Sequence, residues 1–107
     1  MPSRLPKILI RIHELTLNRQ LRFTLKALRE VAELGLRLDT TAVCDILARL
    51  TPADSAGRLH STVRDEWLYI FKPHVASTIL YVKVVLRTNC LIVSFHENED
   101  ADNDANA

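Results

Sequence analysis

The residues best suited to acid–base chemistry alternate with apolar residues near the C-terminal end of this chain. Between residues 79 and 96, two alternating runs flank the short polar turn Thr88-Asn89, a pattern typical of an antiparallel β-hairpin. Because strand side chains alternate between the two faces of a sheet, one face receives Tyr81, Lys83, Arg87, Ser94 and His96. The opposite face receives the apolar residues Leu80, Val82, Val84, Leu86, Leu91, Val93 and Phe95.

Two further predicted strands extend this polar face. Residues 58–63 alternate loosely, and residues 67–72 form a second run that ends at Pro73, which cannot donate to a ladder. The predicted register places Arg58, His60 and Lys72 beside Tyr81. It places Trp67, Tyr69 and Phe71 on the opposite, apolar face, beneath the helices.

This set of side chains favours the hypothesis of metal-free RNA cleavage. RNA supplies its own nucleophile, the ribose 2′-hydroxyl, so a protein need only remove that proton, protonate the leaving 5′-oxygen and stabilise the charge on the phosphate. Imidazole titrates near neutral pH, so either His96 or His60 is a candidate base, with the other histidine or Tyr81 protonating the leaving oxygen. The candidate phosphate-binding cations are Arg58, Lys72 and Lys83, with Arg87 as a peripheral contact.

A plain solvated surface is the alternative interpretation of the same residues. Rows of Lys and Arg on an exposed sheet face are usually solvated, and a histidine near a strand end is usually a surface residue. The four histidines have no Cys or carboxylate partner at metal-ligand spacing, and the chain has no phosphate-cradling glycine loop. The sequence therefore predicts neither a metal site nor a small-molecule cofactor.

The first half of the chain predicts the helices that must support these strands. Thr24 and Asp39 are suitable N-caps for two helices, Pro6 suits the first turn of an earlier one, and Gly35 suits a helix end. Residues 21–23 are expected to be a short extended link. Helices followed by strands predict an α+β domain, with N-terminal helices packed on one face of a four-stranded antiparallel sheet.

Composition limits the remaining possibilities. The chain has 107 residues and is 48% hydrophobic, enough for one domain with one core. Cys44 and Cys90 each lie in an apolar run, which favours buried free thiols over a disulfide or a metal pair. No apolar run is long enough to cross a bilayer and the N-terminus does not resemble a signal peptide, so we expect a cytoplasmic protein without a membrane partner.

The net charge of +1 conceals an uneven distribution. Residues 97–107 contain five of the 13 acidic residues and no Lys or Arg, which predicts a domain over residues 1–96 and an acidic, disordered tail over 97–107. The eight remaining acidic residues against 14 basic ones give the domain a charge of +6. The tail either improves solubility or competes with nucleic acid for the basic face.

Four blocks of this sequence resemble the MqsR family of type II toxins, which are small mRNA interferases with a RelE-like fold. The blocks are R-F-T-L-K-A-L-R-E-V-A-E-L-G-L (22–36), W-L-Y-I-F-K-P (67–73), L-Y-V-K (80–83) and L-I-V-S-F-H-E (91–97). The resemblance runs from about Leu21 to Glu97. It implies metal-independent cleavage of mRNA, inhibition of translation, and neutralisation by a cognate antitoxin that has a helix-turn-helix DNA-binding domain.

The family's site residues carry over unevenly. Tyr81 occupies the position of the family's tyrosine, and His96 stands where the family usually has a lysine. Gly57 or Arg58 is nearest to a second family lysine, and Leu68 replaces the family's glutamine. The resemblance therefore implies a divergent branch in which Arg58, His60, Tyr81 and His96 share the catalytic work.

Two other functions fit the same sequence. A non-catalytic RNA- or protein-binding module would keep the fold and lose the activity, an interpretation favoured by Leu68 and the missing lysine. A module that binds only another regulatory protein would have no nucleic-acid affinity at modest salt, whereas phosphate contacts would give a steep salt dependence.

Overall fold

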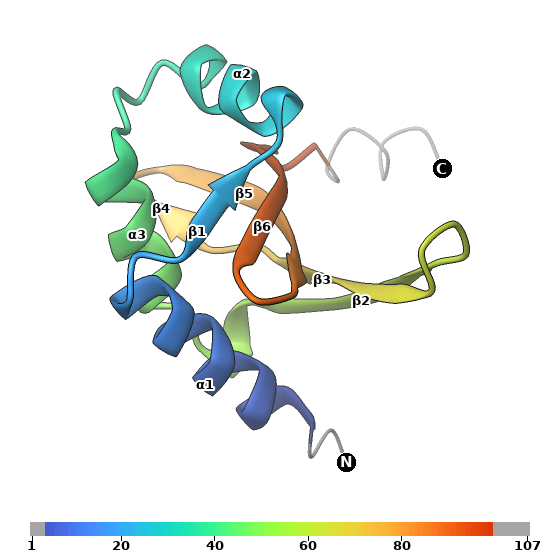
Figure 1. Cartoon of the computed structure of the whole chain (residues 1–107). Coiled ribbons are helices and arrows are strands. Elements are labelled where there is room, and N and C mark those ends of the chain that lie inside the picture. Colours follow the sequence, from blue (N-terminus) through green and yellow to red (C-terminus); the bar gives the residue numbers. More distant parts are fainter. Residues whose placement is uncertain (1–3, 100–107) are drawn as a thin grey trace.

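The structure is a computed structural model that describes residues 4–99. Its helices are α1 (Arg4–Leu17), α2 (Leu25–Glu33), α3 (Thr40–Ala48) and the one-turn 3₁₀ helix η1 (Pro52–Asp54). Its strands are β1 (Leu21–Phe23), β2 (Ser55–Ser61), β3 (Glu66–Phe71), β4 (His74–Val75), β5 (Thr78–Leu86) and β6 (Cys90–Glu97). The helices precede nearly all of the sheet in the chain, so the predicted α+β class is confirmed (Figure 1).

The sheet is larger than predicted and is mixed rather than wholly antiparallel. Its strands follow the order β1-β6-β5-β3-β2, and β4 pairs separately with β5. The four predicted antiparallel strands are present, but residues 21–23 are not a link: they form β1, which pairs in parallel with Cys90–Ile92. The prediction missed β1 because its partner lies at the other end of the chain.

Local capping groups set the helix ends where the sequence predicts them. The Thr24 hydroxyl accepts a hydrogen bond from the Ala27 amide at 3.0 Å, and the Asp39 carboxylate accepts one from the Ala42 amide at 2.8 Å. Gly35 has a positive φ of 72° just after α2, a conformation that glycine adopts without a side-chain clash. These caps fix where α2 and α3 meet the sheet.

One hydrophobic core lies between the helices and one face of the sheet. Leu9, Ile12 and Leu15 of α1 and Val43 and Leu47 of α3 are all 5% exposed or less. From the sheet, the buried residues include Phe71, Leu80, Val82, Val84, Cys90, Ile92 and Phe95. We call this side the core face. The predicted apolar face of β5 is therefore confirmed.

A β-bulge changes which residues of β6 face the core. Lys83 lies opposite Ser94 and Val84 lies opposite Ile92, which leaves Val93 without a direct partner. The predicted apolar set Leu91, Val93 and Phe95 is therefore wrong for its first two members, both of which are only half-buried. An extra residue in one strand shifts the alternation, so that residues on one side of the bulge face the opposite way from the simple pattern continued across it.

The other side of the sheet, which we call the open face, carries the polar residues of the predicted site. Cross-strand partners share a face, so the register of the sheet places on it Leu68, Ile70, Tyr81, Lys83, Val85, Leu91, Ser94 and His96. Ile70 and Val85 are 7% and 2% exposed but do not belong to the main core. They form an apolar floor beside the polar residues.

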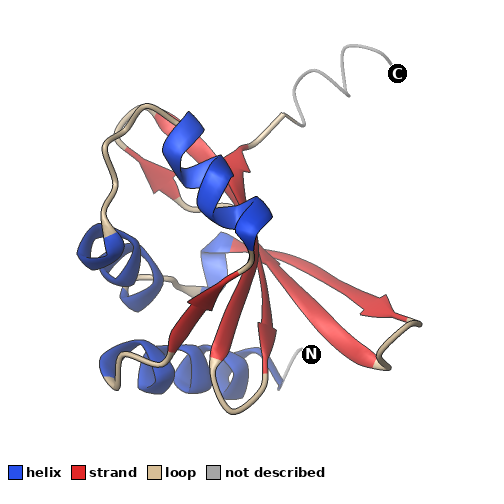
Figure 2. Ribbon diagram, turned by 45° about the horizontal axis from the view of Figure 1, so that its top comes forward, coloured by secondary structure: helices blue, strands red, loops and turns tan. Residues whose placement is uncertain are grey.

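The β2–β3 hairpin extends beyond the helices (Figure 2). Tyr69 packs against the core and Phe71 is buried in it, as predicted. Trp67 is 37% exposed, so its predicted burial beneath the helices is wrong. The strand keeps its alternation, but the helices do not reach the outer part of the hairpin.

The predicted boundary between domain and tail lies at the end of β6. Glu97 belongs to β6, and the amide of Asn98 still donates to the Ile79 carbonyl at 2.8 Å. The remainder of the predicted tail, residues 100–107, lies outside the described residues. Within residues 4–99, no helix is long and apolar enough to cross a membrane.

Candidate active site on the open face

Tyr81 and His96 form the centre of the open face. They are direct cross-strand partners on β5 and β6, and their rings stack with centroids 5.0 Å apart and planes 12° from parallel. Both side chains are half-buried. The structure thus brings together the phenol and the imidazole that the sequence places on one face, and each ring restricts the movement of the other.

One backbone hydrogen bond determines which nitrogen of His96 can act as a base. The Nδ1 atom lies 2.8 Å from the carbonyl oxygen of Glu97. A carbonyl oxygen only accepts, so Nδ1 carries the hydrogen and Nε2 of the neutral ring keeps its lone pair. His96 is therefore arranged to accept a proton at Nε2.

The predicted cations differ in how they relate to this pair. Lys83 lies opposite Ser94, and its Nζ atom is 6.0 Å from the centroid of the Tyr81 ring. Lys72 follows Ile70 by two residues, which places it on the open face by alternation, and its amide donates to the Asp54 carbonyl at 2.7 Å. Both lysines are half-buried.

Arg87 makes a two-pronged ion pair rather than facing solvent alone. Its Nε and Nη2 atoms donate to the two carboxylate oxygens of Glu66 at 3.1 and 2.6 Å. The hydrogen bond from Arg87 lowers the pKa of Glu66, and the same bond raises the pKa of Arg87. Its charge is thus balanced by a carboxylate that lies next to the β2–β3 turn.

Helix α2 adds a further cation, Lys26, which the sequence pattern does not single out. Lys26 Nζ donates to the Ser94 hydroxyl at 3.0 Å and pairs with Glu30 at 2.9 Å. Ser94 is only 2% exposed, whereas the Lys26 side chain is 60% exposed. The ammonium group therefore reaches the open face from the edge of the sheet and remains accessible to a ligand.

Glu30 is the carboxylate of this site and was also missed. Its Oε1 atom accepts a hydrogen bond from the Phe95 amide at 2.9 Å, next to His96. Burial raises the pKa of Glu30, but the Phe95 amide, Lys26 and His96 together lower it below its ordinary value of 4.5. The spacing of Lys26 and Glu30 predicts an ion pair on a helix, but only the pairing of β1 with β6 brings that pair to Ser94.

Arg58 and His60 do not join the open face, so their predicted placement beside Tyr81 is wrong. Arg58 lies opposite Tyr69 and His60 opposite Trp67, which puts both on the core-face side of the hairpin. The register shifts between Ser55 and Arg58, and Gly57 within that interval has a positive φ of 102°. The resulting bulge inverts the alternation that the sequence alone predicts.

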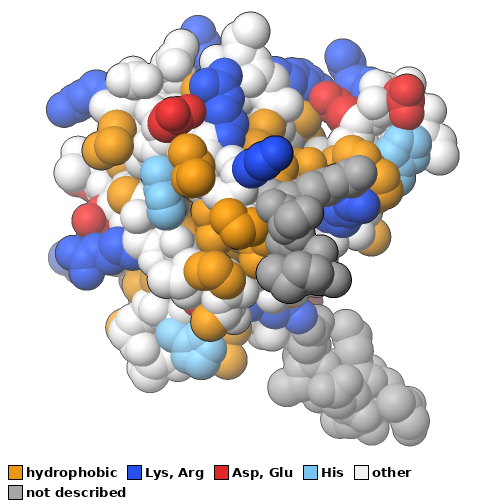
Figure 3. All heavy atoms as spheres, turned by 90° about the horizontal axis from the view of Figure 1, so that it is seen from below, with side chains coloured by type: hydrophobic (Ala, Val, Ile, Leu, Met, Phe, Trp, Pro, Cys, Tyr) orange, Lys and Arg blue, Asp and Glu red, His pale blue; other side chains and the backbone are white. Residues whose placement is uncertain are grey.

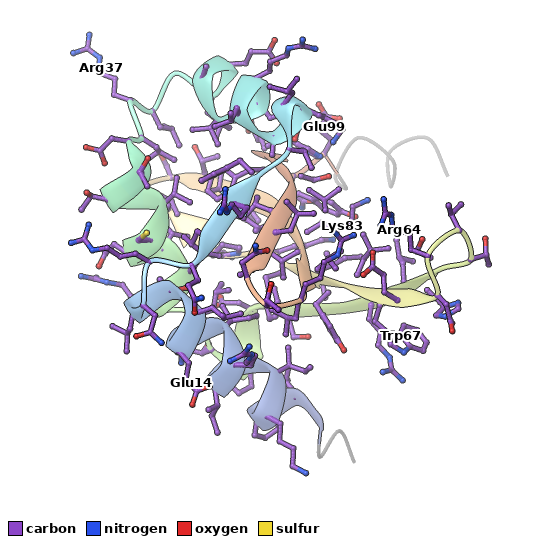
Figure 4. All side chains as sticks on the ribbon, viewed as in Figure 1. Glu14, Arg37, Arg64, Trp67, Lys83 and Glu99 are labelled. Atoms are coloured by element: carbon purple, nitrogen blue, oxygen red, sulfur yellow. The ribbon has the colours of Figure 1, made fainter. Side chains whose placement is uncertain are left out.

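Arg58 and His60 instead surround the indole of Trp67. The guanidinium carbon of Arg58 is 3.8 Å from the ring centroid, and the His60 ring meets Trp67 edge-on at 4.9 Å. His60 Nε2 donates to Asp65 at 2.8 Å. Figure 4 shows Lys83 and Trp67 on opposite sides of the β3 ribbon. The predicted single site is therefore divided between two faces.

The part of the chain that contains the open face matches the model of a known protein family. The family model described as "Motility quorum-sensing regulator, toxin of MqsA" matches residues 6–97, which include Lys26, Glu30, Tyr81 and His96. No curated protein matches the chain. In the part of the chain that is described, no three His, Cys, Asp or Glu side chains are grouped to hold a metal ion. The match covers most of the 107 residues, and the chain belongs to the MqsR toxin family.

Proposed function

We propose that this toxin is a metal-independent endoribonuclease that cleaves mRNA at the open face and thereby inhibits translation. The observation that carries the proposal is the stacked pair of Tyr81 and His96. Nδ1 of His96 faces the Glu97 carbonyl, which leaves the lone pair of the neutral ring on Nε2, and Lys83 and Lys26 lie nearby. A base, an acid and cations are the groups that attack by a ribose 2′-hydroxyl requires.

The proposed step uses each of these groups once. His96 Nε2 takes the proton of the 2′-hydroxyl, and the 2′-oxygen forms a bond to phosphorus. The bond from phosphorus to the 5′-oxygen breaks, and the Tyr81 phenol protonates that oxygen. The products are a 2′,3′-cyclic phosphate and a 5′-hydroxyl, and exchange with water restores the two protonation states.

The lysines would stabilise the charge that develops on the phosphate oxygens. Lys26 bonds Ser94, which lies opposite Lys83, so both ammonium groups belong to the row next to the reacting pair. Glu30 would stabilise the positive charge that His96 acquires when it accepts the proton. Lys72 and Arg87 remain proposed contacts for phosphates farther along the RNA.

The family description also names a partner. It calls its members toxins of MqsA, and we propose that this chain is likewise neutralised by a cognate antitoxin, one that has a helix-turn-helix DNA-binding domain. The charge of +6 over residues 1–96 suits the phosphate backbone of mRNA. Since the proposed substrate is mRNA, the proposed place of action is the cytoplasm.

Incubation of the purified toxin with an end-labelled mRNA in excess chelator tests the proposal. We expect cleavage in chelator, a pH optimum, and fragments that end in a 2′,3′-cyclic phosphate. A matched RNA with a 2′-deoxy sugar at the cleaved position should resist cleavage there, because it lacks the nucleophile. Cleavage of both RNAs at equal rates, or a requirement for a divalent cation, contradicts the mechanism.

A non-catalytic RNA-binding module is the second candidate. Leu68 favours it. This apolar side chain lies opposite Val85 on the open face, at the position where the MqsR family has a glutamine. The position of Arg58 and His60 on the other face of the hairpin also favours it, because two of the predicted catalytic groups then lie apart from Tyr81 and His96. Retention of the intact RNA without cleavage, in the same incubation, would support this candidate.

A further inference from the structure

The outer part of the β2–β3 hairpin carries a cluster of planar side chains that the proposed reaction does not use. Arg58, His60 and Trp67 form this stacking cluster, on the side of the hairpin opposite to Lys83. Trp67 is 37% exposed although it is the largest side chain of the chain. An indole that is left at the surface and ordered by two neighbours is a candidate binding element.

The charges of the hairpin leave the cluster electropositive. Of the two acidic residues in the hairpin, Asp65 pairs with His60 and Glu66 pairs with Arg87. Within residues 4–99, neither Arg58 nor Arg64 has a carboxylate within ion-pair distance. The exposed aromatic surface is therefore accompanied by positive charge, which suits an anionic partner.

We propose that the stacking cluster binds an unpaired base of single-stranded RNA, on the stretch that leaves the open face. The inference rests on the proposed function for the identity of the ligand. Bases stack on aromatic rings and on guanidinium planes, and the sequence tolerance of stacking suits an enzyme that must hold many different mRNAs. Arg58 over Trp67 provides both kinds of plane in one place.

The sheet topology offers a short route between the two sites. The order β6-β5-β3-β2 makes β2 the edge strand, with the hairpin as the last unit of the sheet. Strands lie about 4.8 Å apart, so the edge is roughly 10 Å from β5, which carries Tyr81 and Lys83. An RNA strand that crosses β3 and β2 and turns round this edge arrives at the stacking cluster.

Basic side chains lie close to the stacking cluster. Seen from below in Figure 3, basic, acidic, His and hydrophobic side chains lie together at the hairpin on the right. Because both acidic residues of the hairpin are paired, the phosphates on either side of a stacked base would meet the positive charge of Arg58 and Arg64. This complementarity favours nucleic acid over a protein partner as the occupant.

The chain contains a single tryptophan, so its fluorescence reports on this cluster alone. The experiment titrates the full-length toxin with a single-stranded 2′-O-methyl oligoribonucleotide, which cannot be cleaved because its 2′-oxygen has no proton. We expect saturable quenching of Trp67. Arg58→Ala should weaken the affinity about tenfold, whereas Arg49→Ala, which removes an exposed cation at the C-terminal end of α3, should change it less than about twofold.

Fluorescence and cleavage together separate this inference from the proposed function. If the oligonucleotide quenches Trp67 but the protein does not cleave RNA, the result supports base stacking at the cluster and contradicts the proposed nuclease activity. In the opposite case, the protein cleaves RNA and anisotropy of a labelled oligonucleotide shows binding, but the fluorescence of Trp67 stays constant. That result overturns base stacking at the cluster and supports the proposed nuclease activity. If Arg58→Ala and Arg49→Ala weaken the affinity for the oligonucleotide equally, the effect comes from overall charge, and this result also overturns the inference.

Discussion

At the scale of single residues, Glu30 connects the helix α2 to the strand that carries His96. One carboxylate oxygen accepts the Phe95 amide, which β1 is too short to pair, and the other holds Lys26. Lys26 in turn bonds Ser94. Because these contacts depend on the ionised carboxylate, they link the stability of this edge of the sheet to pH.

Glu30→Gln should therefore make the free energy of unfolding depend less on pH in the acid range. The pKa of Glu30 in the folded protein lies below 4.5, so in that range the unfolded chain binds more protons than the folded one. The stabilisation is fully present above that value and is lost as the pH falls through the depressed folded pKa. Urea unfolding over this pH range should show a shallower slope for Glu30→Gln, and parallel profiles for the two proteins would contradict this role.

The two cysteines should differ in reactivity. Burial raises the pKa of Cys90 from 9.0 to about 12, whereas Cys44 is only half-buried, and the thiolate is the reactive form. We expect iodoacetamide to modify Cys44 in the folded toxin and Cys90 only after unfolding, as measured by mass spectrometry. Cys44→Ser is the matched control and should show no modification while folded. Equal rates at both thiols in the native protein would show that β6 is not packed as described.

At the scale of elements, two bulges decide which side chains meet. The bulge at Val93 keeps Ser94 and His96 beside Lys83 and Tyr81 while Ile92 enters the core. The bulge near Gly57 has the opposite effect, because it places Arg58 and His60 on the other face of the sheet from Tyr81 and His96. Each bulge inserts one residue into an antiparallel pair and so changes the face of everything beyond it.

Gly57→Ala tests the second bulge. A Cβ atom at Gly57 would meet no other atom within 4 Å, so the cost of the change comes from its φ of 102°. We expect a loss of about 1–2 kcal/mol in the free energy of unfolding, because side chains disfavour positive φ. Ala56→Gly is a control at an exposed neighbour and tests whether any change in this segment has the same effect. An unchanged stability in Gly57→Ala would show that the bulge does not need this conformation.

What the sequence predicts correctly in this protein is local, and what it misses is not. The caps at Thr24 and Asp39 and the alternation of β5 depend on neighbours within a few residues, and all of them are confirmed. The pairing of β1 with β6 and the contact of Lys26 with Ser94 join residues about seventy positions apart. No periodic pattern records such a contact, and the position of a bulge depends on the partner strand.

At the scale of the whole molecule, the distribution of charge would determine how the toxin binds its proposed RNA substrate. The 14 Lys and Arg residues lie outside the acidic C-terminal end, and both proposed RNA sites have cations at their margins. Affinity for a polyanion then depends on the release of counterions and falls steeply as salt rises. Salt dependence therefore measures how many phosphates the protein contacts.

Lys83→Ala should reduce that dependence. Each contact with a phosphate of a single strand contributes about 0.7 to the slope of log affinity against log salt, so the loss of one contact should lower the slope by about that amount. Binding of the 2′-O-methyl oligonucleotide across a salt series measures it, with Arg49→Ala as the control. A slope that Lys83→Ala leaves unchanged would remove this lysine from the phosphate site.

In the proposed reaction, His96 and Tyr81 carry out the cleavage together. The most direct measurement is the single-turnover cleavage rate of one mRNA by the wild type, His96→Ala and Tyr81→Phe, with circular dichroism confirming that both variants are folded. We predict a fall of about 10²–10⁴-fold for His96→Ala and a large fall for Tyr81→Phe, which keeps the stacking but lacks the proton. A folded His96→Ala variant that cleaves at the wild-type rate would contradict the account.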